Sequence, residues 1–222
     1  MELLGIMKKL LKKILFKREL PRRVPFGLYR GLNLSIDPGC ELQLYFGLYE
    51  RETYPWLKKA VLGARSAIDV GAGYGELTLW LLKQKTIEKV YAFEPDAKRW
   101  PKFEANLAGN PRAARQTLHL EKGFFEGDEA VKILQQAPGP VLLKIDIDGG
   151  EFDLLTCLKN ELHGKDARIL LEVHSEELNR QCRALLEEIG YQVAPIQKAW
   201  WRWLVPEQRP LGFNQWLVAL KK

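Results

Sequence analysis

Five short apolar segments, each followed by a helical pattern, constrain the fold of this chain most strongly. The apolar segments span 67–70, 89–93, 117–120, 141–147 and 169–173, and the helical patterns span 76–85, 100–109, 127–136, 151–162 and 176–189. Segments dense in Ile, Leu and Val are typical of parallel strands buried on both faces. Because parallel strands need crossover connections, this alternation predicts an α/β fold with helices on both faces of a sheet.

The C-terminal part departs from this rhythm. Residues 190–193 and 214–220 both have strand patterns, with no clear helix between them. A return without a helix favours antiparallel pairing. The sequence therefore predicts a mostly parallel sheet that ends in an antiparallel pair.

The N-terminal residues carry the net charge of the chain. The formal net charge is +6, and residues 1–23 hold eight basic residues against two acidic ones, so the remainder is neutral overall. Apolar residues recur at helical spacing from Leu3 to Leu15, with lysines on the other face, which predicts a basic amphipathic helix. This helix either packs on the domain or lies on an anionic membrane surface or an acidic partner. Both interpretations stay open.

We expect three regions: a leader helix over 1–25, an N-terminal strand and helix segment over 26–62, and a cofactor-binding domain over 63–222. The apolar runs are too short to span a bilayer, and three scattered cysteines are typical of a reducing compartment. We therefore expect a cytoplasmic protein, with residues 1–20 as the candidate for attachment to a membrane surface.

A glycine-rich loop joins the strand predicted at 67–70 to its helix. Its sequence is Asp69-Val-Gly71-Ala-Gly73-Tyr-Gly75. Glycines permit a tight turn and let the backbone approach a ligand closely. The spacing is tighter than the dinucleotide pattern G-x-G-x-x-G, and an acid precedes the first glycine. That acid would repel a pyrophosphate but suits a cofactor with an ammonium and a sulfonium group.

Glu94 ends the next predicted strand, 19 residues after Gly75. A carboxylate there can accept hydrogen bonds from both hydroxyls of a ribose, although a solvated strand-end acid is the alternative. The loop and Glu94 together predict S-adenosylmethionine (SAM) as the cofactor, bound by Asp69, Gly71, Gly73, Gly75 and Glu94. Gly123 and Phe124, after the strand at 117–120, are our candidates for contacts to adenine.

Charged residues fill the end of the strand predicted at 141–147. A period of two places Lys144, Asp146 and Asp148 on one face, at the edge where open α/β sheets bind ligands. Asp146 is a candidate for contact with the methionine end of SAM or with an acceptor hydroxyl. Lys144 and Asp148 are candidates for substrate contacts. The alternative is a buried ion pair between Lys144 and Asp146.

Two further residues are catalytic candidates together with Asp146. His174 follows the strand at 169–173, where a neutral imidazole could take the proton of an acceptor hydroxyl. Glu151 begins the helix after Asp148, where a carboxylate is favoured by the helix dipole. A histidine that only packs or hydrogen-bonds at the rim is the alternative for His174.

In order and spacing these motifs resemble the FkbM-type SAM-dependent methyltransferases over roughly residues 40–220. The similar segments are the loop, Phe93-Glu94-Pro95, the run from Lys144 to Glu151, Glu172-Val-His174, Gly190-Tyr191 and the lead-in Gly47-Leu-Tyr-Glu50. The family commonly has Asn where Gly73 stands and Glu where Asp148 stands. The resemblance implies a Rossmann-like class I methyltransferase sheet of seven strands with an antiparallel last strand. It also implies O-methylation of a sugar, glycan or natural-product hydroxyl.

Asp146, Asp148 and Glu151 also suggest a site for magnesium or calcium, which prefer oxygen ligands. The spacing lacks a loop that could wrap calcium, and the resemblance implies no metal, so we expect none. Two other functions stay open. One is a non-catalytic SAM-fold module docked by the leader. The other is methylation of nucleic acid, which the neutral charge of 24–222 makes less favourable.

Three tryptophans lie in the connection before the final predicted strand, in Trp200-Trp-Arg-Trp203. Tryptophan is usually largely buried, which favours packing beneath a long loop. Alternatively, the faces of Trp200 and Trp201 hold a sugar ring or a flat acceptor, or lie at a membrane interface.

Overall fold

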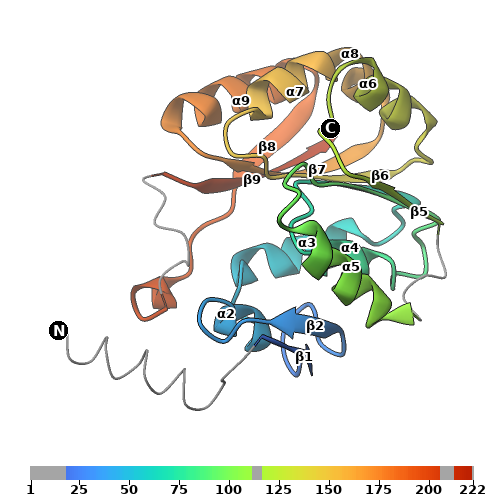
Figure 1. Ribbon diagram of the computed structural model, residues 1–222. Coiled ribbons are helices and arrows are strands. Elements are labelled where there is room, and N and C mark those ends of the chain that lie inside the picture. Colours follow the sequence, from blue (N-terminus) through green and yellow to red (C-terminus); the bar gives the residue numbers. More distant parts are fainter. Residues whose placement is uncertain (1–18, 112–116, 206–212, 222) are drawn as a thin grey trace.

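The structure is a computed structural model that describes residues 19–111, 117–205 and 213–221. Seven strands of these residues form one sheet in the order β5-β4-β3-β6-β7-β9-β8 (Figure 1). The strands are β3 (Ser66–Val70), β4 (Lys89–Phe93), β5 (Thr117–Glu121), β6 (Val141–Ile145), β7 (Ala167–Val173), β8 (Tyr191–Pro195) and β9 (Gln215–Lys221). Strand order reverses at β3, which places the ends of β3 and β6 side by side at the switch point of the sheet.

The last strand is antiparallel, as predicted. β9 lies between β7 and β8 and runs antiparallel to both. The pairs from β5 to β7 are all parallel. The predicted α/β fold class, a Rossmann-like seven-stranded sheet with an antiparallel last strand, is therefore confirmed.

One strand is shorter than predicted, and this changes the candidate site. β6 ends at Ile145, so Asp146 and Asp148 lie in the loop that follows it. Asp148 has a left-handed backbone, with φ +52°. The prediction that Asp148 shares a strand face with Lys144 is therefore wrong, because the strand alternation stops before it.

Helices cover both faces of the sheet (Figure 1). One face carries α6 (Gly127–Gln136), α7 (Glu151–Cys157), α8 (Lys159–Gly164) and α9 (Glu176–Glu188), and the other carries α3 (Tyr54–Ala60), α4 (Glu76–Leu81) and α5 (Trp100–Ala108). Each layer has its own buried apolar cluster, with Leu134, Leu155 and Leu186 in the first and Leu57 and Leu79 in the second. Each such side chain contributes roughly 1.5–3 kcal/mol by leaving water, which holds the helices on the sheet.

The segment before β3 packs on the side of α4 and α5. It contains β1 (Leu20–Arg23), β2 (Asn33–Ile36), α2 (Leu42–Tyr45) and the 3-10 helix η1 (Arg51–Thr53). β1 pairs with β2 in antiparallel fashion, and the amide of Ser35 donates to Asn106 Oδ1 of α5 at 2.6 Å. The leader predicted over 1–25 therefore does not stay helical to its end, because residues 20–23 are paired as a strand. The helix predicted from Leu3 to Leu15 lies outside the described residues.

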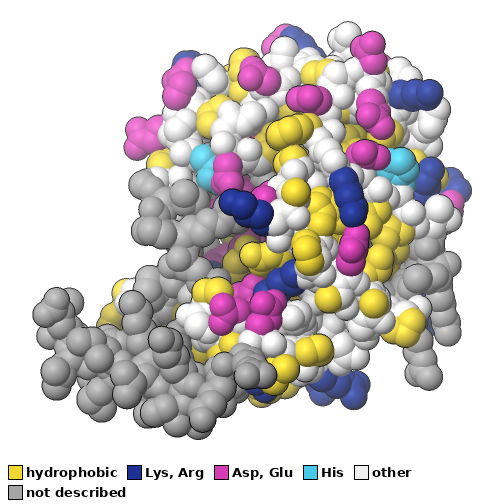
Figure 2. Space-filling model, viewed as in Figure 1, with side chains coloured by type: hydrophobic (Ala, Val, Ile, Leu, Met, Phe, Trp, Pro, Cys, Tyr) yellow, Lys and Arg dark blue, Asp and Glu magenta, His cyan; other side chains and the backbone are white. Residues whose placement is uncertain are grey.

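Acidic and basic side chains are interspersed over the described part of the face seen in Figure 2, in keeping with the neutral charge of residues 24–222. Among the described residues, we find no helix with the length and apolar character to cross a membrane.

Candidate active site

A cavity of about 350 Å³ opens at the carboxyl ends of β3 and β6. Its walls come from the loop after β3, the ends of β6 and β7, the segment at 40–52 and the chain at 196–202 before β9. Small-molecule sites usually measure roughly 300–1,000 Å³, and open α/β sheets bind ligands at this edge. The cavity is therefore the candidate active site.

Glycine is needed at different positions of the predicted cofactor loop for different structural reasons. Gly71, Gly73 and Gly75 all have left-handed backbones, with φ +76°, +60° and +83°. A Cβ atom added at Gly71 would lie 1.8 Å from the backbone oxygen of Asp146, whereas at Gly73 the nearest atom would be 3.9 Å away. Gly71 is thus required by the packing of the loop on the chain after β6. Gly73 leaves its backbone open to the cavity, which it lines.

Glu94 lies at the end of β4 and is almost fully buried. Its Oε2 accepts hydrogen bonds from the amide of Gly73 at 2.7 Å and from Arg99 at 3.3 Å, and its Oε1 accepts from the amide of Asp96 at 2.9 Å. The carboxylate of Glu94 therefore holds the glycine loop in place. Glu94 does not line the cavity, and its contact with a ribose stays a prediction.

Asp69 and Lys144 form the floor of the cavity. Thr78 donates to Asp69 Oδ2 at 2.6 Å, and Lys144 Nζ lies 3.7 Å from Asp69 Oδ1 and 3.5 Å from Asp146 Oδ2. Lys144 also donates to the backbone oxygen of Gly71 at 2.8 Å. Burial opposes its charge, but Asp146 and Asp69 hold the pKa of Lys144 above its ordinary value. The buried ion pair considered for Lys144 and Asp146 is present, and both residues line the cavity.

Two acids that the sequence did not single out as site residues lie close to Asp146 in the wall of the cavity. Glu50 precedes η1 and Glu172 lies on β7, and oxygens of Glu50, Asp146 and Glu172 lie within 4.8 Å of one another. Burial raises the pKa of Glu50 to about 7 and that of Glu172 to about 9. At neutral pH Glu172 is therefore mostly protonated and Glu50 is about half protonated. Glu50 ends the lead-in motif Gly47-Leu-Tyr-Glu50, which was the available signal.

The predicted catalytic residues His174 and Glu151 contact each other. His174 Nδ1 lies 2.5 Å from Glu151 Oε1, and this hydrogen bond raises the pKa of His174 above its ordinary value. Neither residue lines the cavity, whereas Asp146 does. Asp146 Oδ1 lies 3.7 Å from His174 Nε2 and so connects the pair to the cavity.

Gly75 and the remaining predicted residues do not line the cavity. Gly123 and Phe124 follow β5, do not line the cavity, and Phe124 is 67% exposed. Their contact with adenine stays a prediction. Asp148 also lies outside the cavity wall, with its carboxylate 3.2 Å from His174 Nε2.

Packing of the tryptophans as core is wrong. Trp200 and Trp203 are 79% and 73% exposed, because they stand on one side of the 3-10 helix η3 (Trp200–Trp203), where residues three apart align. The neighbouring Arg202 turns inward, lines the cavity and binds both carboxylate oxygens of Glu52 at 2.6 Å. Trp201 stacks against Arg202 at 4.7 Å. Since neither Trp200 nor Trp201 lines the cavity, their acceptor contacts stay a prediction.

The residues present fit SAM. A Cβ atom added at Gly73 would have Arg99 as its nearest neighbour, at 3.9 Å, and Gly73 lines the cavity, so the glycine keeps room for a ligand close to the backbone. The buried oxygen Oδ1 of Asp69 makes no hydrogen bond, and the carboxylate of Asp146 lies beside it around Lys144. Carboxylates at this place suit the ammonium and sulfonium charges of SAM.

No protein-family model and no curated protein matches the sequence of this chain. Many solved structures have a similar fold. A methyltransferase from Pyrococcus furiosus matches with a TM-score of 0.54 and 17% identity, over 97% of this chain and 95% of the other. An O-methyltransferase from Bacillus cereus, solved in complex with SAH, matches with a TM-score of 0.53 and 15% identity, over 77% of this chain and 80% of the other.

A third similar structure is the precorrin-6y C5,15-methyltransferase from Geobacter metallireducens GS-15. It matches with a TM-score of 0.51 and 14% identity, over 76% of this chain and 89% of the other. These proteins differ in what they methylate, and identities this low establish shared architecture only. The chain thus has the Rossmann-like fold of class I methyltransferases.

Proposed function

We propose that this chain is a SAM-dependent O-methyltransferase of the FkbM type that methylates a hydroxyl of a sugar, glycan or natural-product acceptor. The observation that carries the proposal is the cavity at the switch point of a methyltransferase-type sheet. One wall of that cavity is the glycine loop, and its floor holds Asp69, Lys144 and Asp146. The similar fold of an O-methyltransferase solved with SAH supports the same cofactor class.

SAM supplies an electrophilic methyl group when bound, so the chain itself needs only to orient the acceptor and receive its proton. The acceptor oxygen forms the new bond to carbon while the carbon–sulfur bond breaks toward sulfur. Asp146 is our candidate to receive the hydroxyl proton, because it lines the cavity, whereas burial raises the pKa of Glu50 and Glu172, which also line it. Lys144 keeps Asp146 in position through the 3.5 Å ion pair.

Glu50 and Glu172 lie beside Asp146 in the wall of the cavity, where the acceptor would bind. Asn214 donates to Glu172 Oε1 at 3.0 Å, which fixes that side chain on β7. Protonated carboxyl groups both donate and accept hydrogen bonds, which suits recognition of a polyhydroxylated acceptor. The acceptor class rests on this match and on the resemblance to the FkbM type.

The test has two arms. Calorimetry with SAM and with SAH measures cofactor binding, and transfer of a labelled methyl group from SAM is measured on a panel of sugars, glycans and plant or microbial natural products. Asp146→Asn should lower kcat at least about 100-fold, the lower end of the range for losing a proton acceptor, with SAM affinity changed much less. Asp153→Asn, an exposed acid in the first turn of α7, is the matched control.

The outcomes separate the alternatives. SAM binding without transfer to any acceptor would favour the non-catalytic binding module. Methyl transfer to RNA or DNA but to none of the panel would favour a nucleic-acid methyltransferase. A fully active Asp146→Asn variant would refute the role given to Asp146 while leaving the reaction class intact.

A further inference from the structure

His174 has the arrangement of a metal ligand held by a carboxylate. Its side chain is 10% exposed, and Glu151, which is fully buried, contacts its Nδ1 at 2.5 Å. The other ring nitrogen, Nε2, is buried and makes no hydrogen bond. Histidines that bind metals commonly donate their second N–H to a carboxylate, which fixes the ring and its tautomer.

The unpartnered nitrogen points at two carboxylates of the loop after β6. Nε2 lies 3.2 Å from Asp148 Oδ1 and 3.7 Å from Asp146 Oδ1. Donor atoms of Asp146, Asp148 and His174 all lie within 4.8 Å of one another. Two donors bound at about 2.1 Å to a tetrahedral ion lie about 3.4 Å apart, so these separations match one shared ion.

The charges at this place also favour a cation. Lys144 Nζ forms ion pairs with Asp69 Oδ1 at 3.7 Å and with Asp146 Oδ2 at 3.5 Å. Glu151 lies behind the histidine as a further acid, and its side chain is buried. A cation bound between Asp146 and Asp148 would offset the repulsion between their negative charges.

We propose that Asp146, Asp148 and His174 bind one divalent transition-metal ion, with Glu151 as the positioning residue behind the histidine. One imidazole nitrogen and two carboxylate oxygens suit Mn²⁺ or Zn²⁺ better than calcium. This ligand set differs from the oxygen-only set of Asp146, Asp148 and Glu151 weighed from the sequence, because Glu151 points to the histidine. It also revises the expectation of no metal. The proposal does not rest on the proposed methyl transfer.

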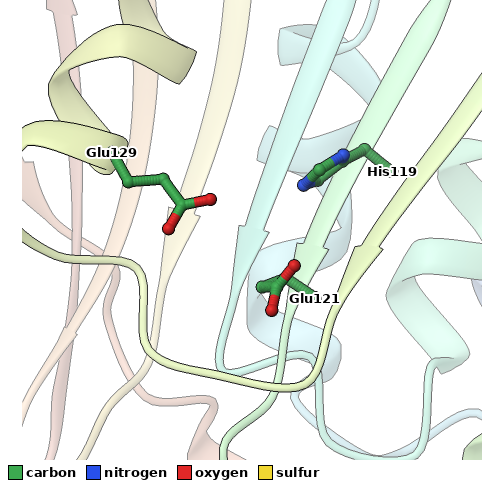
Figure 3. A group of neighbouring side chains, drawn as sticks. All are labelled: His119, Glu121 and Glu129. Carbon is green, nitrogen blue, oxygen red and sulfur yellow. The ribbon is translucent and has the colours of Figure 1, made fainter.

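A second group of possible metal ligands, which we call the rival group, lies at the edge strand β5 of the sheet. His119 and Glu121 of β5 and Glu129 of α6 also have donor atoms within 4.8 Å of one another, and Figure 3 shows the three side chains facing a common space. His119 is packed near Tyr91, with ring centroids 5.6 Å apart. Among the described hydrogen bonds, none joins His119 to a carboxylate that would hold its ring, as Glu151 holds His174. Glu129 is also exposed. We therefore favour the site at His174.

The experiment titrates the metal-free full chain with Mn²⁺, without SAM or acceptor, and follows the free-ion signal by electron paramagnetic resonance. The wild type should bind one Mn²⁺, and Zn²⁺ should displace it. Asp148→Asn removes one ligand charge at a side chain that is 58% exposed, and Asn tolerates the left-handed backbone there. This change should weaken Mn²⁺ binding at least tenfold. Glu151→Gln should weaken it roughly 10- to 100-fold, the usual range for a partner of a metal-bound histidine.

Two controls keep the test decisive. Asp153→Asn makes the same charge change on α7 and should leave Mn²⁺ affinity unchanged. Glu129→Gln alters the rival group and should also leave it unchanged. Absence of Mn²⁺ and Zn²⁺ binding to the wild type would overturn the proposal. So would loss of binding in Glu129→Gln with full binding in Asp148→Asn. Circular dichroism of each variant shows that the fold is retained.

Discussion

Replacing Gly71 or Gly73 by alanine, which adds one methyl group, tests the packing of the glycine loop. Both have left-handed backbones, so alanine costs about 1–2 kcal/mol at either position from backbone strain alone. Only at Gly71 does the added Cβ atom collide with backbone, 1.8 Å from the oxygen and 2.9 Å from the carbonyl carbon of Asp146. The backbone must therefore separate there, and overpacking of this kind costs a further 1–3 kcal/mol, roughly.

Gly71→Ala should lower the free energy of unfolding by about 2–5 kcal/mol, and Gly73→Ala by only about 1–2 kcal/mol. Urea unfolding followed by far-UV circular dichroism measures both, provided that the slope with denaturant stays constant. Gly73→Ala should nevertheless weaken SAM binding, because Gly73 lines the cavity. Equal destabilisation of the two variants would refute the assigned packing of Gly71 on Asp146.

Three further predictions concern Glu94, Glu76 and the leader. Glu94→Gln should weaken SAM binding by roughly 1–3 kcal/mol in calorimetry, the range for lost charge-assisted hydrogen bonds, and unchanged affinity would remove Glu94 from the cofactor site. Burial raises the pKa of Glu76 from 4.5 to about 7, so the folded state binds its proton more tightly than the unfolded chain. Its contribution to stability is full below pH 4.5 and is lost as the pH rises to 7, by up to about 3 kcal/mol. Glu76→Gln should therefore flatten the fall in melting temperature between pH 5 and 8, and an unchanged pH profile would contradict the shift. Removal of residues 1–18 should reduce binding to anionic liposomes and leave SAM affinity unchanged, and equal liposome binding would reject the membrane interpretation.

The sheet could be predicted from the sequence because each strand is a short apolar run and each connection a helical pattern. The antiparallel end followed from the missing helix before the strand at Gln215–Lys221. The loop at Asp69 was predictable because few residue types permit three left-handed positions so close together.

The residues around Asp146 were less predictable from the sequence. Glu50 and Glu172 are 122 positions apart, and only the folded chain brings their carboxyl groups to Asp146. Asp148 left the strand pattern because its backbone is left-handed, and so it contacts His174 rather than the cavity. The prediction that the tryptophans are buried was wrong because burial follows residue type only on average. The short 3-10 helix directs Arg202 inward and leaves Trp200 and Trp203 exposed.

Calorimetric titration of the purified wild-type chain with SAM tests the central claim most directly, with Gly73→Val as the comparison. The cavity beside the glycine loop predicts one SAM bound per chain, and loss of that binding in Gly73→Val while the circular dichroism spectrum stays that of the wild type. Absence of SAM binding to the wild type at millimolar concentrations, or equal affinity in the Gly73→Val variant, would contradict it.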